Sequence, residues 1–182
     1  MTTAALVVVD LQNDYLTDGS WPLDQVDDAI DTTRDLLDWA RGNDTPIIHI
    51  RHEATSDQAP FFRPGTPGAD SVPRVAAQGE EPTVHKHRPN AFHETDLLDR
   101  LKNLGTQQVI LAGAMSQMCI DATARAARDF GFDVTVAHDA CAAKEAAFNG
   151  VTVPAPQVHA AFMAALGLAY ADVKAAAEIM GR

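Results

Sequence analysis

The sequence predicts an α/β protein: a three-layer, Rossmann-like fold in which a mostly parallel sheet of about six strands carries helices on both faces. Short apolar runs rich in β-branched residues alternate with longer segments of helical period, the pattern of strand–helix–strand units with right-handed crossovers. The first run, Ala4–Val9, is apolar throughout, as expected for a strand that a parallel sheet buries on both faces. No repeat or linker interrupts the 182 residues, so we expect a single domain over residues 1–182.

The remaining elements follow from the same two patterns. Helices are predicted where apolar residues recur at helical spacing, and strands where apolar residues run together. Gly and Asn residues end the expected helices. The expected order is strand 4–9, helix 24–43, strand 46–50, extended piece 83–86, helix 94–104, strand 108–112, helix 117–130, strand 132–137, helix 156–170 and a short strand 172–175.

Residues 51–82 form a long stretch without a periodic pattern, rich in Pro, Gly and Ala. A loop of this length in a compact domain is often functional and covers a site. An apolar wall with one or two cations would suit a small amide that bears a carboxylate or a planar group, and we expect Arg63 to contact such a carboxylate. Plain core packing is the alternative for the aromatic residues. The residues expected to line this substrate pocket are Gln12, Trp21, Phe61, Phe62, Arg63, Phe92, Met118 and Phe148.

The composition narrows the classes of partner. A formal net charge of −11 argues against nucleic acid as a ligand, because phosphate binding requires clustered Lys and Arg. No apolar stretch approaches the roughly 20 residues of a membrane span, and the N-terminus does not have the features of a signal peptide. Two cysteines in a chain of this length favour a reducing, cytoplasmic compartment. The Ala-rich C-terminal helix favours a homodimer or a larger homo-oligomer.

Three residues with complementary chemistry follow expected strands. Asp10 ends the first strand, Lys86 ends the extended piece, and Cys119 lies at the start of a helix. Sites in open α/β sheets form at the carboxyl ends of the strands, so these side chains are expected on one edge. A helix N-terminus and a nearby Lys favour a thiolate, while an acid can accept and return a proton. Cys141, which follows another strand, is expected to be a buried filler.

Three segments resemble the isochorismatase-like cysteine hydrolases, in the same order and over nearly the whole chain. This resemblance implies that Asp10, Lys86 and Cys119 form a catalytic triad, with Asp10 as the general base and Lys86 supporting the thiolate. The thiolate attacks a carbonyl carbon, expels an amine or ammonia, and leaves a thioester that water hydrolyses. The segments are Val7–Tyr15, His85–Phe92 and Gly113–Thr123, and the match extends to His138-Asp139-Ala140.

The resemblance also implies a cis peptide bond between Ala114 and Met115, and an oxyanion hole formed by the backbone N–H groups of Met115 and Cys119. No metal or other cofactor is expected, because the family's metal-binding nicotinamidases use an Asp-x-His pattern after the second strand. Here that region reads His49-Ile50-Arg51-His52-Glu53. Isochorismatase itself has no such Cys, which makes its vinyl-ether chemistry doubtful. Asn90 stands where the family often has Ser, a change that affects the pocket floor.

The leading hypothesis is an amidohydrolase that cleaves a C–N bond of a small amide or ureido compound through a thioester. A thioesterase or esterase with the same triad is the first alternative, and a non-catalytic binding protein of the same fold is the second. A flavodoxin-like nucleotide-binding module would need a Gly-rich loop after the first strand. Residues 10–13 contain no glycine, which argues against that reading.

Overall fold

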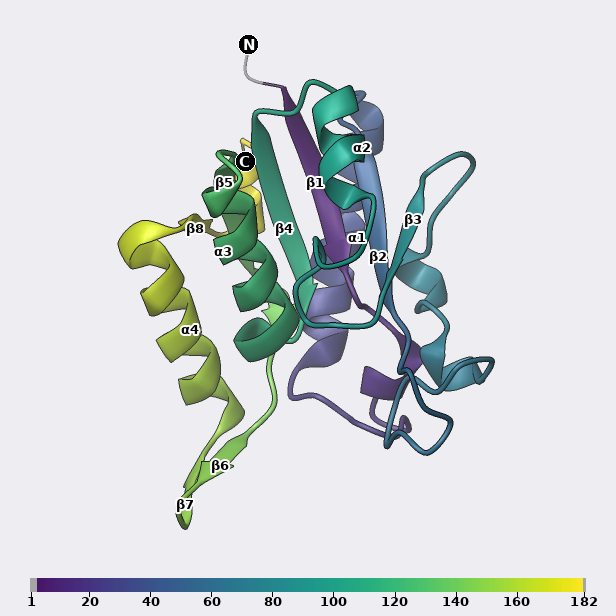
Figure 1. Cartoon of the computed structure of the whole chain (residues 1–182). Helices are drawn as coiled ribbons and strands as arrows, with labels where there is room; N and C mark the ends of the chain where they lie inside the picture. The colour runs from purple at the N-terminus through teal and green to yellow at the C-terminus, as the bar shows by residue number, and fades with distance from the viewer. Residues whose placement is uncertain (1–2, 182) are drawn as a thin grey trace.

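The computed structural model describes residues 3–181, and its centre is a six-stranded sheet in the order β3-β2-β1-β4-β5-β8 (Figure 1). Every neighbouring pair of strands is parallel. The chain starts in the middle of the sheet, winds to one edge, and returns to build the other half from β4. The strands are β1 (Ala4–Val9), β2 (Ile47–His52), β3 (Thr83–Lys86), β4 (Gln108–Ala114), β5 (Asp133–Ala142) and β8 (Asp172–Lys174).

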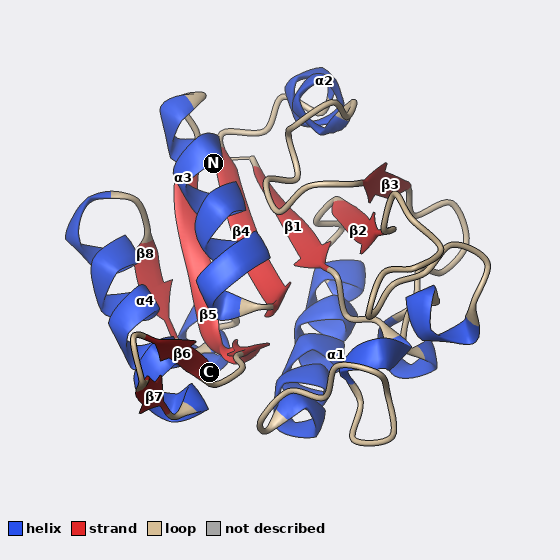
Figure 2. Ribbon diagram, turned by 60° about the horizontal axis from the view of Figure 1, so that its bottom comes forward, coloured by secondary structure: helices blue, strands red, loops and turns tan. Residues whose placement is uncertain are grey.

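Helices cover both faces of this sheet and produce the predicted three layers (Figure 2). On one face Leu6 and Val8 of β1 pack with α1 (Val26–Gly42) and α5 (Ala176–Ile179). Ala5, Val7 and Val9 point to the other face, where α2, α3 and α4 form the second apolar cluster. The expected double burial of the first strand is therefore confirmed. These three helices span Leu97–Asn103, Asp121–Asp129 and Ala155–Ala169.

Four elements differ from the sequence prediction. The strand expected over 132–137 is the longer β5, which continues to Ala142 and therefore contains Cys141. A two-stranded hairpin of β6 (Ala146–Phe148) and β7 (Val151–Val153) precedes α4, and the short helix α5 follows β8. The hairpin turn is Asn149-Gly150, with φ angles of 49° and 78°, which suits the positive-φ geometry of a two-residue turn. The helix expected over 117–130 begins as a π-helical turn, η4 (Ser116–Ile120), before α3 continues.

Buried polar groups anchor the long loop between β2 and β3 to the rest of the domain. It contains two short 3-10 helices, η2 (Pro67–Ala69) and η3 (Pro73–Val75). The carboxylate of Asp14, which lies in the 3-10 helix η1 (Asn13–Tyr15), accepts a hydrogen bond of 2.6 Å from the backbone N–H of Phe62. A Cβ on Gly68 would stand 2.1 Å from the Asp14 carboxylate, so the loop packs closely against η1.

None of the helices in residues 3–181 combines the length and apolar character needed to cross a bilayer.

Candidate active site

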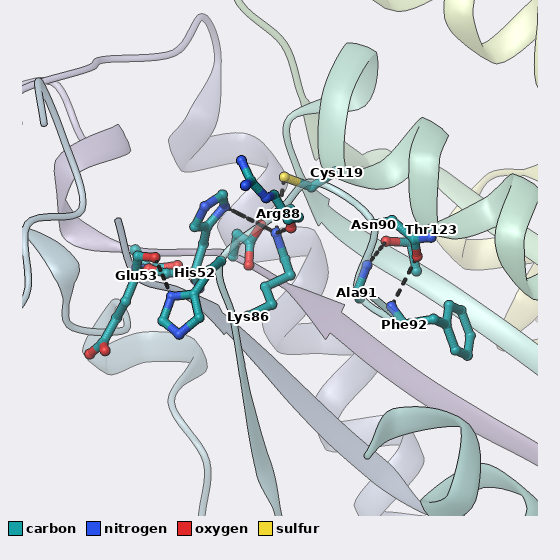
Figure 3. A network of polar contacts seen from close by, with 12 residues as sticks. His52, Glu53, Lys86, Arg88, Asn90, Ala91, Phe92, Cys119 and Thr123 are labelled. Carbon is teal, nitrogen blue, oxygen red and sulfur yellow. Dashed lines mark hydrogen bonds and ion pairs between the residues drawn. The ribbon is translucent and has the colours of Figure 1, made fainter. Parts of the chain in front are cut away.

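The sheet brings Asp10, Lys86 and Cys119 together at its carboxyl edge. Figure 3 shows Lys86 and Cys119 in this cluster. Asp10 follows β1, Lys86 ends β3, and Cys119 lies in η4 just after β4. The Nζ atom of Lys86 is 2.6 Å from Oδ2 of Asp10 and donates a hydrogen bond of 3.2 Å to Sγ of Cys119. Because β2 lies between β1 and β3, the long side chain of Lys86 must reach across β2 to meet the other two groups.

Asp10 is fully buried, and its carboxylate is incompletely satisfied. Its backbone adopts a φ of 52°, in the left-handed region that Asp tolerates better than most residues, and this turns the chain out of β1. Within residues 3–181 no group donates a hydrogen bond to Oδ1. Buried carboxylate oxygens nearly always have a donor. Oδ1 is therefore available as a proton acceptor, and one carboxylate oxygen of Asp10 lies within 4.8 Å of the Cys119 sulfur.

Lys86 is held as an ammonium group by its surroundings. Besides Asp10 and Cys119, its Nζ contacts Nδ1 of His52 and the backbone oxygen of Arg88, both at 3.1 Å. Burial alone would lower the pKa of Lys86, but the Asp10 carboxylate and Cys119 raise it by more. The three protons of the ammonium face four acceptors, which fixes its position.

The surroundings of Cys119 oppose a thiolate in the resting protein, in contrast to the expected ionised sulfur. Burial raises the pKa of the thiol most, and the negative charge of Asp10 raises it further, while Lys86 only partly offsets both. The side chain is 3% exposed, so water contributes little to stabilising a thiolate. The arrangement favours ionisation only when the proton moves to Asp10, because the ammonium then faces a thiolate instead of a carboxylate.

The turn that carries Cys119 begins with a cis peptide bond between Ala114 and Met115, as the family resemblance implied. The backbone oxygen of Met115 accepts hydrogen bonds from the N–H groups of Met118 and Ile120 and so closes the π-helical turn. Within residues 3–181 the N–H of Met115 donates no hydrogen bond to the protein. This N–H is therefore free for a ligand.

His52, the last residue of β2, is the member of the cluster that the sequence analysis missed as a site residue. Asp10, His52 and Cys119 offer three ligand atoms within 4.8 Å of one another, a chemically suitable set for a metal ion. However, Nζ of Lys86 lies between 2.6 and 3.2 Å from one atom of each. A divalent cation here would meet a like charge, so the cluster fits proton transfer and not metal binding. The signal for His52 in the sequence was its position shortly after the strand expected over 46–50.

Several expected pocket residues gather beside His52. The ring of Phe62 lies 5.7 Å from the imidazole of His52, measured between centroids, and 4.7 Å from the ring of Tyr15. Phe61 stacks on Trp21 at 4.9 Å. The guanidinium of Arg63 makes no ion pair or hydrogen bond within residues 3–181. An aromatic wall therefore borders the cluster, and the contact of Arg63 with a substrate carboxylate stays a prediction.

Four other expected pocket residues do not take that position. The side-chain amide of Gln12 bonds backbone groups. Its Nε2 donates to the oxygens of His52 and Ala69, and its Oε1 accepts from the N–H of His52, each at 2.8 Å. Phe92 packs between α2 and α3 against Phe130 and Phe132, and its ring points away from the cluster (Figure 3). Met118 is 44% exposed, and Phe148 is 87% exposed on the hairpin. Core packing accounts for Phe92, and the pocket roles of Gln12, Met118 and Phe148 stay predictions.

Cys141 is buried, as expected for a filler. Burial is also the main reason that the pKa of its thiol is raised to about 12.

Residues 4–173 match the protein-family model of the Isochorismatase domain. The Bacillus subtilis protein YddQ, described as an uncharacterized isochorismatase family protein, is 40% identical over 172 residues, which cover 94% of this chain and 96% of the relative. Streptothricin hydrolase from Streptomyces noursei is 33% identical over 166 residues, which cover 90% of this chain and 65% of the relative. The crystal structure of an Oleispira antarctica protein assigned to the isochorismatase hydrolases superposes with a TM-score of 0.96 at 47% identity, over 100% of this chain and 97% of that one. The chain therefore belongs to the isochorismatase family of hydrolases.

Proposed function

We propose that this single-domain chain is a metal-independent cysteine amidohydrolase that cleaves a C–N bond of a small amide or ureido compound. The observation that carries the proposal is the buried ammonium of Lys86, which contacts both the Asp10 carboxylate at 2.6 Å and the Cys119 sulfur at 3.2 Å. This geometry provides a nucleophile, a proton acceptor and a fixed positive charge in one water-poor place. Because the nucleophilic thiol must stay reduced, a reducing compartment such as the cytoplasm suits the chemistry.

In the proposed acylation step, the thiol proton of Cys119 moves to Oδ1 of Asp10 while the sulfur attacks the substrate carbonyl carbon. A C–S bond forms, and the carbonyl oxygen takes up negative charge that the backbone N–H groups of Met115 and Cys119 would stabilise. The C–N bond then breaks as Asp10 returns the proton to the departing nitrogen. Lys86 keeps its proton throughout and stabilises whichever partner is anionic.

In the proposed deacylation step, water attacks the thioester carbon and gives a proton to Asp10. The C–S bond breaks, the carboxylic acid leaves, and Asp10 returns the proton to the sulfur. The same groups would act on an ester or thioester, whose leaving group is an alcohol or a thiol. The protonation of the leaving nitrogen by Asp10 favours amides, because amines are the poorer leaving groups and need that proton.

The experiment is intact-protein mass spectrometry after incubation with a panel of small amides, ureido compounds and matched esters. We expect an acyl adduct on Cys119 that decays as product forms, with amides turned over in preference to esters. The matched control is the second buried cysteine: Cys141→Ala should keep the adduct and the turnover, and Cys119→Ala should lose both while still folding. Turnover that survives Cys119→Ala would contradict the proposal. No adduct and no turnover across the panel would favour a binding protein.

We also propose that two copies associate through an uncharged face made of the β6–β7 hairpin and helix α4. Residues 146–170 contain no Asp, Glu, Lys or Arg, in a chain with 25 acidic and 14 basic residues. Phe148 and Leu168 are each 87% exposed, and Val151 is 62% exposed. The cores of protein interfaces are depleted of charged residues, and copies of a chain with net charge −11 repel one another over their charged faces. A second copy is therefore the partner that this face fits best.

A further inference from the structure

We infer that His52 is a specificity-determining residue: its imidazole is held in the neutral Nε2–H tautomer, and this N–H donates a hydrogen bond to a second acceptor on the substrate, separate from the scissile carbonyl. The inference rests on the proposed amidohydrolase function, because it concerns the same site. It names the substrate class more narrowly, as small amides that carry a further oxygen or nitrogen acceptor close to the carbonyl.

The position of His52 is fixed from three sides. It ends β2, the strand between those that supply Asp10 and Lys86. The side-chain amide of Gln12 bonds both the N–H and the oxygen of its backbone, and the ring of Phe62 packs 5.7 Å from its ring. A side chain held in this way presents its nitrogens in constant directions. His52 therefore meets the preorganisation requirement of a recognition residue.

The contact with Lys86 decides which nitrogen carries the proton. An ammonium group can only donate, so Nδ1 of His52, 3.1 Å from Nζ, must accept and is unprotonated. Burial, together with the positive charge of Lys86, lowers the pKa of His52 to about 4. The ring is therefore neutral near pH 7, and its single proton is on Nε2.

The Nε2–H group has no partner in the protein and is accessible. Within residues 3–181 no hydrogen bond involves Nε2 of His52, and this atom is not among the buried, unsatisfied ones. The side chain is 17% exposed, and its Nδ1 atom lies 4.0 Å from Asp10 Oδ2. An uncharged donor thus faces accessible space beside the reacting groups. A donor placed in this way rejects substrates that leave it unpaired.

Two substitutions test the roles of the two ring nitrogens of His52 separately. His52→Asn can keep an acceptor near the Nδ1 position for Lys86 but removes the outer donor. His52→Gln can place an amide N–H near the Nε2 position but removes the acceptor for Lys86. Acetoacetamide and butanamide serve as probes, because they differ only by one carbonyl acceptor. We expect wild type and His52→Gln to prefer acetoacetamide by about five- to tenfold in kcat/KM, as for one neutral hydrogen bond. His52→Asn should reduce this preference to less than twofold.

Nitrogen-15 NMR of the imidazole provides a readout that needs no turnover. In wild type we expect the Nε2–H tautomer, with no protonation between pH 8 and 5.5. Lys86→Met should release the tautomer preference. A wild-type Nδ1–H tautomer, or an unchanged preference for acetoacetamide in His52→Asn, would overturn the inference while leaving amidohydrolase activity intact. The absence of any Cys119 adduct across the wider panel would instead overturn the proposed function, and the NMR result would still decide the tautomer.

Discussion

Among the single residues, Asp10 has two opposite effects on Cys119. Its charge raises the pKa of the thiol, and its free Oδ1 is the proposed acceptor of the thiol proton. In Asp10→Asn the charge is lost but Lys86 remains beside the sulfur. We therefore expect iodoacetamide to alkylate Cys119 faster at pH 7, while amide turnover falls by about 10²–10⁴-fold, the usual contribution of a general base.

The increase in alkylation rate and the decrease in turnover are best measured in a Cys141→Ala background. In that background each alkylated cysteine is Cys119. If Asp10→Asn slowed alkylation, the resting sulfur would already be ionised in wild type and the burial argument would be wrong. If turnover were retained, another group would be the proton acceptor.

The sequence identified Asp10, Lys86 and Cys119 because each follows a strand and lies in a segment that resembles a known family. His52 also ends a strand, but its importance depends on β2 lying between β1 and β3, and strand order is not visible in a single sequence. The raised pKa of the Cys119 thiol is hidden from the sequence for a related reason. The motif reveals the neighbouring charges, but only the packed structure reveals a side chain that is 3% exposed.

At the scale of elements, the hairpin and α4 together form the proposed contact between copies. Leu168→Glu would place a negative charge on an exposed, uncharged face of α4, and we expect it to shift analytical ultracentrifugation profiles towards the monomer. Leu104→Glu is the matched control, because Leu104 is also exposed, at 44%, but follows α2. A wild-type monomer at all concentrations, or dissociation by both variants, would contradict the proposed interface.

The β6–β7 hairpin has a turn signal in the sequence, although no strands were predicted there. Asn149-Gly150 is a strong two-residue turn signal, and it is flanked by Ala-Ala-Phe and Val-Thr-Val. Each strand has only three residues, and a lone hairpin of this size is marginally stable in water, so the pattern alone is a weak signal. The six strands of the main sheet were easier to find, because burial on both faces makes their sequences apolar.

For the whole molecule, buried histidines predict a loss of stability in acid. The folded-state pKa values of His49, His52 and His159 are all lowered, with burial as the largest cause. The unfolded chain therefore binds protons first as the pH falls below about 6.5, and stability present above that pH is lost on acidification. Between pH 7.5 and 5.5, His52 alone should remove about 1 kcal/mol from the free energy of unfolding, since its pKa is about 4.

Urea unfolding at the two pH values measures this loss through the transition midpoint. His52→Asn should reduce the difference between the two midpoints. A wild-type midpoint that is higher at pH 5.5 than at pH 7.5 would contradict the prediction, because the lowered pKa values of the histidines and of Glu81 both imply lower stability in acid.

The uncharged face also determines which proteases can cleave the folded protein there. Trypsin cuts after Lys and Arg, and the chain offers it no site between Lys144 and Lys174. The exposed hairpin tip with Phe148 therefore survives trypsin even when nothing covers it. Chymotrypsin, which cuts after aromatic residues, does find a site there. Resistance to trypsin therefore says nothing about the hairpin. Resistance to chymotrypsin at the hairpin would indicate that the hairpin is shielded.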